Sequence, residues 1–448
     1  MLYTDPSTPR EAAFDAARLA VTEKRFAIGC GLLVSVAVFL TVGRGFAGMG
    51  ARIALLLFPL TGVFAWLLVP NARMTKHQSR QAIHAWLWVG LPLLAYFLTA
   101  LAGLLIHGDS TSVLDKPVRM LVLSGGLFVW LHLRFDRMTF QRVVVVMSIL
   151  GGVLALAVAG YERFGLGIDR VGAEIFPIQF ADITMSISLI CVVWAIGLEQ
   201  PLRGLAALGA TFSLLACWMA ASRGAFVALM ALPWIVGFAS GKRLTTSKAL
   251  AVLGVAGAVL AVGLAANSGL RARLGDMGSD LRAYSQGNPN TSLGMRLQMW
   301  DNSLHVFAGS PFFGVGSRGY MEAQQRGVDE GRLHPAIMEF NGAHNQFIDA
   351  LAKGGLLHGL STLALFAVPW LWFLHFCRRS HDVPLHAVAG FAVTSAFPLF
   401  ALSQHVLNHS SGAMFFAGGV VLFALAAGPR YGTMNAPTAS TAAPGTHP

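Results

Sequence analysis

One histidine and three arginines in this sequence have the types and positions needed for chemistry on an anionic substrate. His344 follows the turn pair Asn341-Gly342 and stands where a polar segment, Asn267 to Ala343, gives way to an apolar run. We therefore expect His344 in the first turn of a helix, where the helix dipole disfavours imidazolium. A neutral imidazole within reach of an acceptor hydroxyl can act as a general base. Alternatively, His344 caps the helix or hydrogen-bonds at its start.

The three arginines, Arg119, Arg223 and Arg296, each adjoin apolar sequence on the same predicted side of a membrane. Arg223 separates two apolar runs, and an arginine in such a position usually faces a cavity or a partner. Arg296 lies in Leu293–Trp300, whose spacing predicts a short amphipathic helix on the membrane surface. Guanidinium groups bind phosphate oxygens bidentately, so the three could neutralise a lipid pyrophosphate. Snorkelling to the interface is the alternative.

Other polar residues give weaker signals. His405 and His409 stand near the end of a later apolar run and could approach the same cavity. Two histidines four residues apart without a carboxylate pattern are a weak metal signal, so no metal centre is predicted. Arg318 lies in Ser310–Tyr320, a segment rich in glycine and aromatic residues that favours a plain turn over a phosphate-binding loop. The sequence contains neither an Asp-x-Asp metal clamp nor a Walker A motif.

The composition decides what kind of molecule must position these residues. The chain is 55% hydrophobic and 12% charged, with a mean hydropathy of +0.61, whereas soluble domains are about 25% charged. Continuously apolar runs long enough to cross the bilayer predict an all-α polytopic membrane protein rather than a β-barrel. We expect about twelve membrane-spanning helices, roughly 26–42, 51–69, 82–106, 117–133, 143–160, 178–198, 202–220, 222–239, 248–266, 345–376, 385–405 and 411–428.

The distribution of Lys and Arg among the short loops predicts the orientation. It puts both termini in the cytoplasm and the long polar segment on the outer face, and it accounts for most of the net charge of +11 without nucleic acid. The predicted organisation is a cytoplasmic N-terminus, nine helices, a large outer loop, three helices and a disordered cytoplasmic tail: 1–25, 26–266, 267–343, 344–428 and 429–448. Only a turn or a broken helix fits between the seventh and eighth spans.

Five motifs carry a resemblance to a known family: Leu114–Arg119, Ser222–Ala225, Arg296 with Trp300, Ser310–Gly316, and Ala343–Leu351 running into Gly354-Gly355. Together they resemble the bacterial O-antigen ligases (lipid A-core:surface polymer ligases), within the superfamily that also holds O-antigen polymerases and O-linked oligosaccharyltransferases. The resemblance extends over the whole membrane body, including the late periplasmic loop.

The resemblance implies an inverting, metal-independent glycosyltransferase with a glycosyltransferase-C-like helical fold, no cofactor and no nucleic-acid partner. Such an enzyme moves O-antigen glycan from undecaprenyl pyrophosphate to lipid A-core at the periplasmic face of the cell inner membrane, in lipopolysaccharide biosynthesis. By this resemblance His344 is the base, and Arg223 and Arg296 bind the pyrophosphate with assistance from Arg119. Asn345, Arg318 and His405 are candidates for supporting roles.

Three alternatives share part of this evidence. An O-antigen polymerase uses the same donor but a growing glycan as acceptor, and it has the same physical requirements. A protein-directed oligosaccharyltransferase is disfavoured because those relatives often carry additional C-terminal sequence. A transporter or flippase for a lipid-linked sugar would also need outer-face arginines, but no matching polar relay crosses the predicted bilayer midplane.

Overall fold

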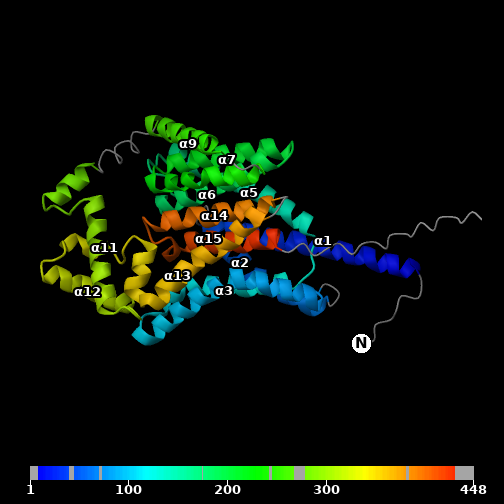
Figure 1. Cartoon of the computed structure of the whole chain (residues 1–448), viewed down its shortest axis with the longest axis horizontal. Coiled ribbons are helices and arrows are strands. Elements are labelled where there is room, and N and C mark those ends of the chain that lie inside the picture. Colours follow the sequence, from blue (N-terminus) through cyan, green and yellow to red (C-terminus); the bar gives the residue numbers. More distant parts are fainter. Residues whose placement is uncertain are drawn as a thin grey trace, which may run out of the picture.

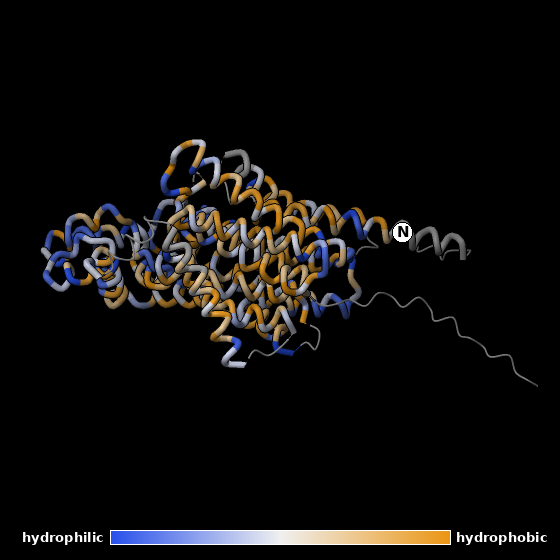
Figure 2. Tube along the Cα trace, turned by 90° about the horizontal axis from the view of Figure 1, so that it is seen from above, coloured by the Kyte–Doolittle hydropathy of each residue, from blue (hydrophilic) through white to orange (hydrophobic). Residues whose placement is uncertain are grey.

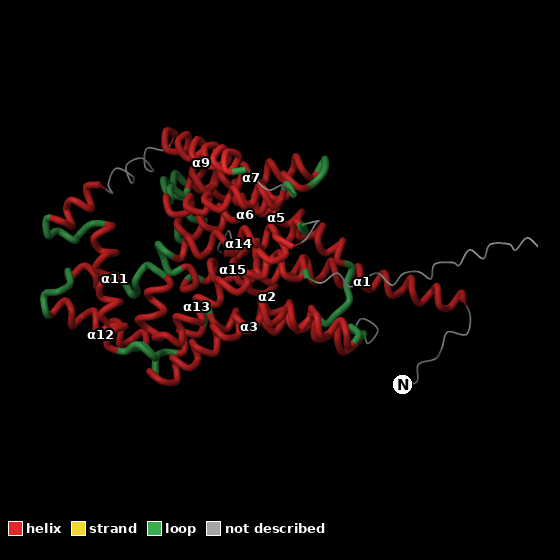
Figure 3. Tube along the Cα trace, viewed as in Figure 1, coloured by secondary structure: helices red, strands yellow, loops and turns green. Residues whose placement is uncertain are grey.

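The computed structural model describes residues 9–39, 45–69, 73–173, 175–241, 245–266, 278–379 and 383–428. Every named element in these ranges is a helix, and a single bridge between Arg73 and Leu133 is the one β-type pairing (Figures 1 and 3). The predicted all-α class is therefore confirmed. The predicted tail 429–448, the start of the predicted N-terminus, 1–8, and the start of the predicted loop, 267–277, lie outside the described residues.

Each predicted apolar span overlaps a helix of the described ranges. These helices are α1 (Pro9–Phe39), α2 (Gly45–Leu68), α3 (Lys76–His107), α4 (Pro117–Leu131), α5 (Arg137–Gly160), α6 (Pro177–Gly197), α7 (Leu202–Met219), α8 (Leu232–Ala239), α9 (Thr246–Ala266), α13 (Gln346–Arg379), α14 (Leu385–Ala401) and α15 (Ser410–Ala427). Of the span predicted at 222–239, α8 covers only the second part. Within the described ranges, seven helices are long and apolar enough to cross a membrane, and shorter apolar helices accompany them. The protein is thus a polytopic membrane protein.

The centre of the bundle is formed by α6 and α15. Their most apolar windows are 78% and 89% buried, whereas α3 and α7 bury only 28% and 33%. The outer helices leave leucines such as Leu68 and Leu105 exposed, as expected where lipid rather than protein covers the surface. Figure 2 shows the apolar bundle joined at one end to a more hydrophilic lobe.

Close helix packing in the bundle depends on small residues and on buried indole N–H groups that have hydrogen-bond partners. A Cβ on Gly152 of α5 would come within 2.6 Å of the carbonyl oxygen of Gly209 in α7, so these two backbones touch. The buried indole of Trp130 donates to the carbonyl of Phe58 at 2.8 Å, which satisfies its N–H away from water.

The connection between α7 and α8 combines the two predicted forms: a tight turn is followed by a break in the helix. α7 ends at Met219, Ala221 takes a left-handed conformation with φ 49°, and the short helix η5 (Arg223–Ala231) leads into α8. Arg223 is therefore the first residue after the turn.

The hydrophilic lobe is formed by α11 (Ser292–Gly309), α12 (Gly316–Asp329) and the short helix η6 (Pro335–Glu339), and it lies beside one end of the bundle (Figure 1). The helix predicted at Leu293–Trp300 is present as part of α11. Its apolar residues Met295 and Met299 pack within the lobe against Leu333 and Ile337. Their burial there, rather than in lipid, gives the lobe its own small core.

The lobe is fixed to the bundle at a break in α13. Gly355 has φ 63°, and the backbone N–H of the next residue, Leu356, donates to the carbonyl of Pro311 at 2.7 Å. Gly314 packs so closely on α13 that a Cβ would lie 2.4 Å from the carbonyl carbon of Lys353. The glycine-rich segment is thus a docking turn, as its composition favoured, and it holds the lobe over the start of α13.

Candidate functional site

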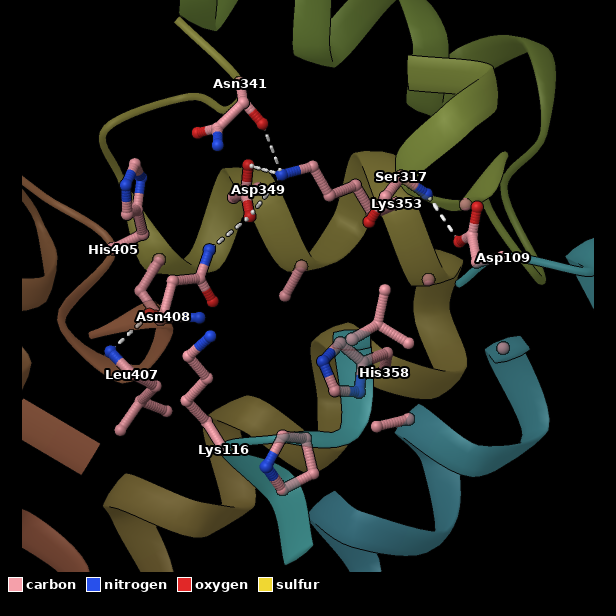
Figure 4. Close-up of a pocket in the computed structure, with 18 of the residues that line it drawn as sticks. Asp109, Lys116, Ser317, Asn341, Asp349, Lys353, His358, His405, Leu407 and Asn408 are labelled. Carbon is pink, nitrogen blue, oxygen red and sulfur yellow. Dashed lines mark hydrogen bonds and ion pairs between the residues drawn. The ribbon is translucent and has the colours of Figure 1, made fainter. Parts of the chain in front are cut away.

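A cavity of about 830 Å³ opens where the lobe meets the bundle (Figure 4). Its walls come from the end of α3, the start of α4, the lobe, the start of α13, and the segment between α14 and α15 that includes the short helix η7 (Val406–Asn408). His344, His405, His409, Lys116 and Lys353 are among the polar residues on these walls. The site therefore joins segments that are far apart in the sequence.

The sequence predicted His344 in the first turn of α13. In the structure His344 lies outside the helix, immediately before its N-terminal cap. Asn345 caps that helix: its side-chain oxygen accepts from the backbone N–H groups of Phe347 at 3.0 Å and Ile348 at 3.2 Å. The Asn345 amide also donates to the carbonyl of Leu402 at 3.1 Å. His344 itself has φ 47°, a conformation that costs energy for a residue with a Cβ and clusters at functional sites.

Asp349, one turn into α13, holds this strained segment in position. Its carboxylate accepts from the backbone N–H of Ala343 at 3.0 Å and pairs with Lys353 at 2.8 Å (Figure 4). It also accepts from the amide of Asn408 at 3.3 Å. A Cβ on Gly342 would lie 2.5 Å from this carboxylate, so only glycine fits there. Asp349 was not predicted as a site residue, although an acid inside an apolar run is a recognised functional signal.

Three imidazole rings form a row along the cavity. The ring centroids of His344 and His405 are 4.7 Å apart, and those of His405 and His409 are 5.5 Å apart. Phe340 also contacts His344, with ring centroids 5.4 Å apart. His405 is 7% exposed, and its Nδ1 atom has no hydrogen-bond partner within the described part of the chain. The structure thus brings together the three histidines that the sequence separated.

All three rings lie in surroundings that favour the neutral form. Burial lowers the pKa of His344 below its usual value, and the charge of Arg296 lowers it further, while Asp349 opposes the shift. Burial lowers the pKa of His405 to about 3 and that of His409 to about 4. At neutral pH each ring is therefore uncharged and can accept a hydrogen bond.

The predicted arginines divide into separate groups. Arg296 and Arg223 are close enough to interact: burial lowers the pKa of Arg296, and the charge of Arg223 lowers it further. Because the charge of Arg296 also acts on His344, these three side chains lie in one neighbourhood, although neither arginine lines the cavity. Arg119 instead donates to the carbonyl of Ser410 at 3.1 Å, beside His409.

Arg318 lies apart from this neighbourhood. Its side chain is exposed, and its backbone N–H donates to the carboxylate of Asp109 at 3.1 Å, as that of Ser317 does at 2.7 Å. These bonds connect the start of α12 to the end of α3. In the structure Arg318 therefore contributes to docking of the lobe on α3, through its backbone.

A second buried acid, Asp182, is hydrogen-bonded to a residue of the cavity wall. Gln404 lies on the cavity wall and donates to the carboxylate of Asp182, which is 2% exposed inside α6. Gln179 donates in turn to Gln404 at 2.9 Å. In the described ranges no group of three or more His, Cys, Asp or Glu side chains is arranged to hold a metal ion.

Comparison with known proteins assigns a family to the part of the chain that carries His344. Residues 208–363 match a family model described as O-antigen ligase. The resemblance inferred from the motifs is thereby confirmed, and it fits the O-antigen ligase and polymerase superfamily. The match includes Arg223, Arg296, His344 and Asp349, whereas Arg119, His405 and His409 lie outside it.

Two relatives extend the comparison. An uncharacterized protein of Haemophilus influenzae is 24% identical over 419 residues, which is 90% of this chain and 99% of that protein. An O-antigen ligase of Escherichia coli K12 is 31% identical over 129 residues, which is 28% of this chain and 30% of that protein. The family match and the similarity to an O-antigen ligase support an integral membrane enzyme of the ligase or polymerase kind in lipopolysaccharide biosynthesis.

Proposed function

We propose that this protein is an O-antigen ligase that transfers a glycan from undecaprenyl pyrophosphate to lipid A-core at the periplasmic face of the inner membrane. The observation that carries the proposal is the neighbourhood of His344. A neutral imidazole, held in a strained backbone conformation on a large cavity, lies within electrostatic reach of Arg296, on which the charge of Arg223 acts in turn. A base and a pair of fixed cations are the two elements that this transfer requires.

In the proposed reaction His344 takes the proton of the acceptor hydroxyl. The hydroxyl oxygen then attacks the anomeric carbon of the donor sugar, and the bond from that carbon to the pyrophosphate oxygen breaks. Undecaprenyl pyrophosphate leaves with the bonding electron pair, and attack from the opposite face inverts the anomeric configuration. The lowered pKa of His344 supports this role because the ring is neutral before the acceptor binds.

Arg223 and Arg296 would bind the pyrophosphate and stabilise the charge that develops as it leaves. Both side chains are partly buried, so each cation acts on a bound phosphate with less screening than at an open surface. Asp349 has no direct part in the reaction. As a positioning residue, it would hold the backbone of Ala343 and present a compensating charge when His344 becomes imidazolium.

The test is transfer in vitro with purified protein, undecaprenyl-pyrophosphate glycan and lipid A-core, comparing the wild type with His344→Ala. Product from the wild type alone would support both the ligase reaction and the role of His344. Product from both proteins would leave the reaction but remove His344 from it. If neither protein formed product while the wild type moved the donor across the bilayer and His344→Ala did not, a flippase would replace the enzyme.

The same family match favours an O-antigen polymerase as the second candidate. A polymerase would give no product with lipid A-core but would elongate a second lipid-linked glycan. In a deletion strain, loss of the ligase leaves lipid A-core without glycan, whereas loss of the polymerase leaves a single attached repeat unit. These two outcomes separate the candidates independently of the purified reaction.

A further inference from the structure

Cationic side chains stand at both ends of the row of three histidines. At one end the charge of Arg296 acts on His344, and that of Arg223 acts on Arg296. At the other end the charge of Lys116 acts on His409. The two ends are connected through His405, whose ring is within 4.7 Å of one neighbour and 5.5 Å of the other. One reaction centre thus lies between two separate groups of cations.

Lys116 is the cation that faces the cavity at the His409 end. It lies on the cavity wall at the residue before α4, and Figure 4 shows its side chain extending toward Asn408. Among the described residues its ammonium has no hydrogen-bond or ion-pair partner. Lys353, on the opposite wall, is already paired with Asp349 and also donates to the carbonyl of Asn341. Lys116 is therefore available to a ligand, whereas Lys353 is committed to the structure.

Two further cations, Arg119 and Arg52, belong to the same side of the site, although neither lines the cavity as Lys116 does. Arg119 follows it by one turn of α4 and donates to Ser410, the residue after His409. The charge of Arg52, an exposed residue of α2, acts on Arg119, and Asp115 partly offsets it. Of the carboxylates on the cavity wall, Asp109 accepts from the start of α12 and Asp349 pairs with Lys353. Glu339 is exposed on the side formed by the lobe.

We propose that Lys116, supported by Arg119 and Arg52, forms a second anion site that binds a phosphate group of the acceptor lipid. This inference rests on the proposed transferase function and divides its two lipid substrates between the two ends of the row. The donor pyrophosphate binds at Arg223 and Arg296, the acceptor phosphate binds at Lys116, and the acceptor hydroxyl reaches His344 from the cavity side. Arg119 then serves the acceptor and not the donor.

Two acceptors would supply the required phosphate: phosphorylated lipid A-core in a ligase, and a second lipid-linked pyrophosphate glycan in a polymerase. Binding separates this inference from catalysis, because it is measured on the His344→Ala protein in nanodiscs. The probes are lipid A-core with its phosphates, the same lipid after enzymatic dephosphorylation, and the undecaprenyl-pyrophosphate glycan. Each is titrated against His344→Ala alone and against His344→Ala combined with Lys116→Gln, Lys116→Arg or Arg296→Gln.

We expect Lys116→Gln to weaken binding of phosphorylated acceptor about tenfold, the usual loss for one charged hydrogen bond. Lys116→Arg should retain binding, and dephosphorylated acceptor should bind with equal affinity whether or not the protein carries Lys116→Gln. Arg296→Gln should instead weaken the donor alone. Equal affinity for phosphorylated and dephosphorylated acceptor would overturn the second site. So would parallel losses of donor and acceptor affinity in Lys116→Gln.

The two acceptor sources and the two hypotheses remain distinguishable. Selective binding of lipid A-core supports the ligase form of the site, and two additive binding events of the lipid-linked pyrophosphate glycan, one lost in Lys116→Gln, support the polymerase form. If the wild type transfers no glycan to either acceptor while phosphate-dependent binding persists, the transferase function fails and the anion site stands. If transfer proceeds but ignores the acceptor phosphate, the anion site fails alone.

Discussion

The two ends of the histidine row are built in different ways. His344 stands on an irregular segment with φ 47°, braced by Asp349 and capped by Asn345, and its cations come from a turn and from the lobe. His409 stands at the start of α15, and Lys116 stands at the start of α4. The end that carries the proposed base has an enforced backbone geometry, whereas the other end has a cation open to the cavity.

The largest effect should come from the histidines themselves. We expect His344→Gln to lower kcat by about 10²- to 10⁴-fold, the range for loss of a general base. His409→Gln should lower kcat by about tenfold or less, because the proposed mechanism does not use His409 as a base. Single-turnover rates with saturating lipids measure both. Equal losses in the two variants would remove the distinction between the ends.

The next effect tests how the His344 segment is braced. Asp349→Asn leaves Lys353 without its buried partner, and we expect it to lower the free energy of unfolding by about 3 kcal/mol. Combining it with Lys353→Met should recover part of the loss, since no unpaired charge remains. Thermal unfolding in detergent measures both. If Asp349→Asn is as stable as the wild type, the brace does not stabilise the fold.

Substitutions that keep the charge should separate the two groups of cations. Arg223→Lys is expected to lower kcat/KM by about 10- to 100-fold, because an ammonium cannot make the paired hydrogen bonds of a guanidinium to phosphate. Lys116→Arg should stay within about threefold of the wild type, since there a point charge is enough. Near-normal turnover in Arg223→Lys would argue against bidentate phosphate binding.

A smaller effect is expected in the pH dependence. The pKa of His344 is lowered, so the ring is neutral at pH 7 and kcat/KM should fall only as the pH drops below that lowered pKa. Removing the charge in Arg296→Gln raises the pKa of His344 and moves this acid limb to higher pH, by about one unit or less. Lys116→Gln acts on His409 and should leave the limb unchanged. A limb that moves equally in both variants would contradict the separation.

The smallest expected effect is that of metal removal. We expect EDTA to leave the rate of glycan transfer unchanged, because guanidinium and ammonium groups supply the positive charge at both ends of the histidine row. Initial rates before and after dialysis against the chelator measure this. Activity that EDTA removes and a divalent ion restores would require a revised mechanism.

Much of the fold followed from local sequence. Continuous apolar runs predicted the helices, because a chain in lipid must satisfy its backbone hydrogen bonds within each segment. The turn or break between the seventh and eighth predicted spans, at Ser222–Gly224, was also visible as a pattern. The precise placement of His344 was not, since the sequence put it inside the helix, whereas the Asn345 cap excludes it.

The contacts of the site were less visible. Asp349 and Lys116 stand in motifs that the sequence singled out, yet neither received a role, because their partners are contributed by other segments. Arg119 was grouped with Arg223 and Arg296 since all three were predicted on one side of the membrane. A shared side of the membrane does not determine distance within it, and the structure puts Arg119 beside Ser410.

The sequence by itself determined the helical class, the order of the apolar segments and the residue types suited to a lipid pyrophosphate. These depend on hydropathy and on side-chain chemistry, which are local properties. Only the tertiary structure decided that His344, His405 and His409 share one cavity, that Asp349 braces the first of them, and that the cations divide between two ends. Those relations depend on how α4, α13 and α15 pack and on where the lobe docks, which no single segment of the chain specifies.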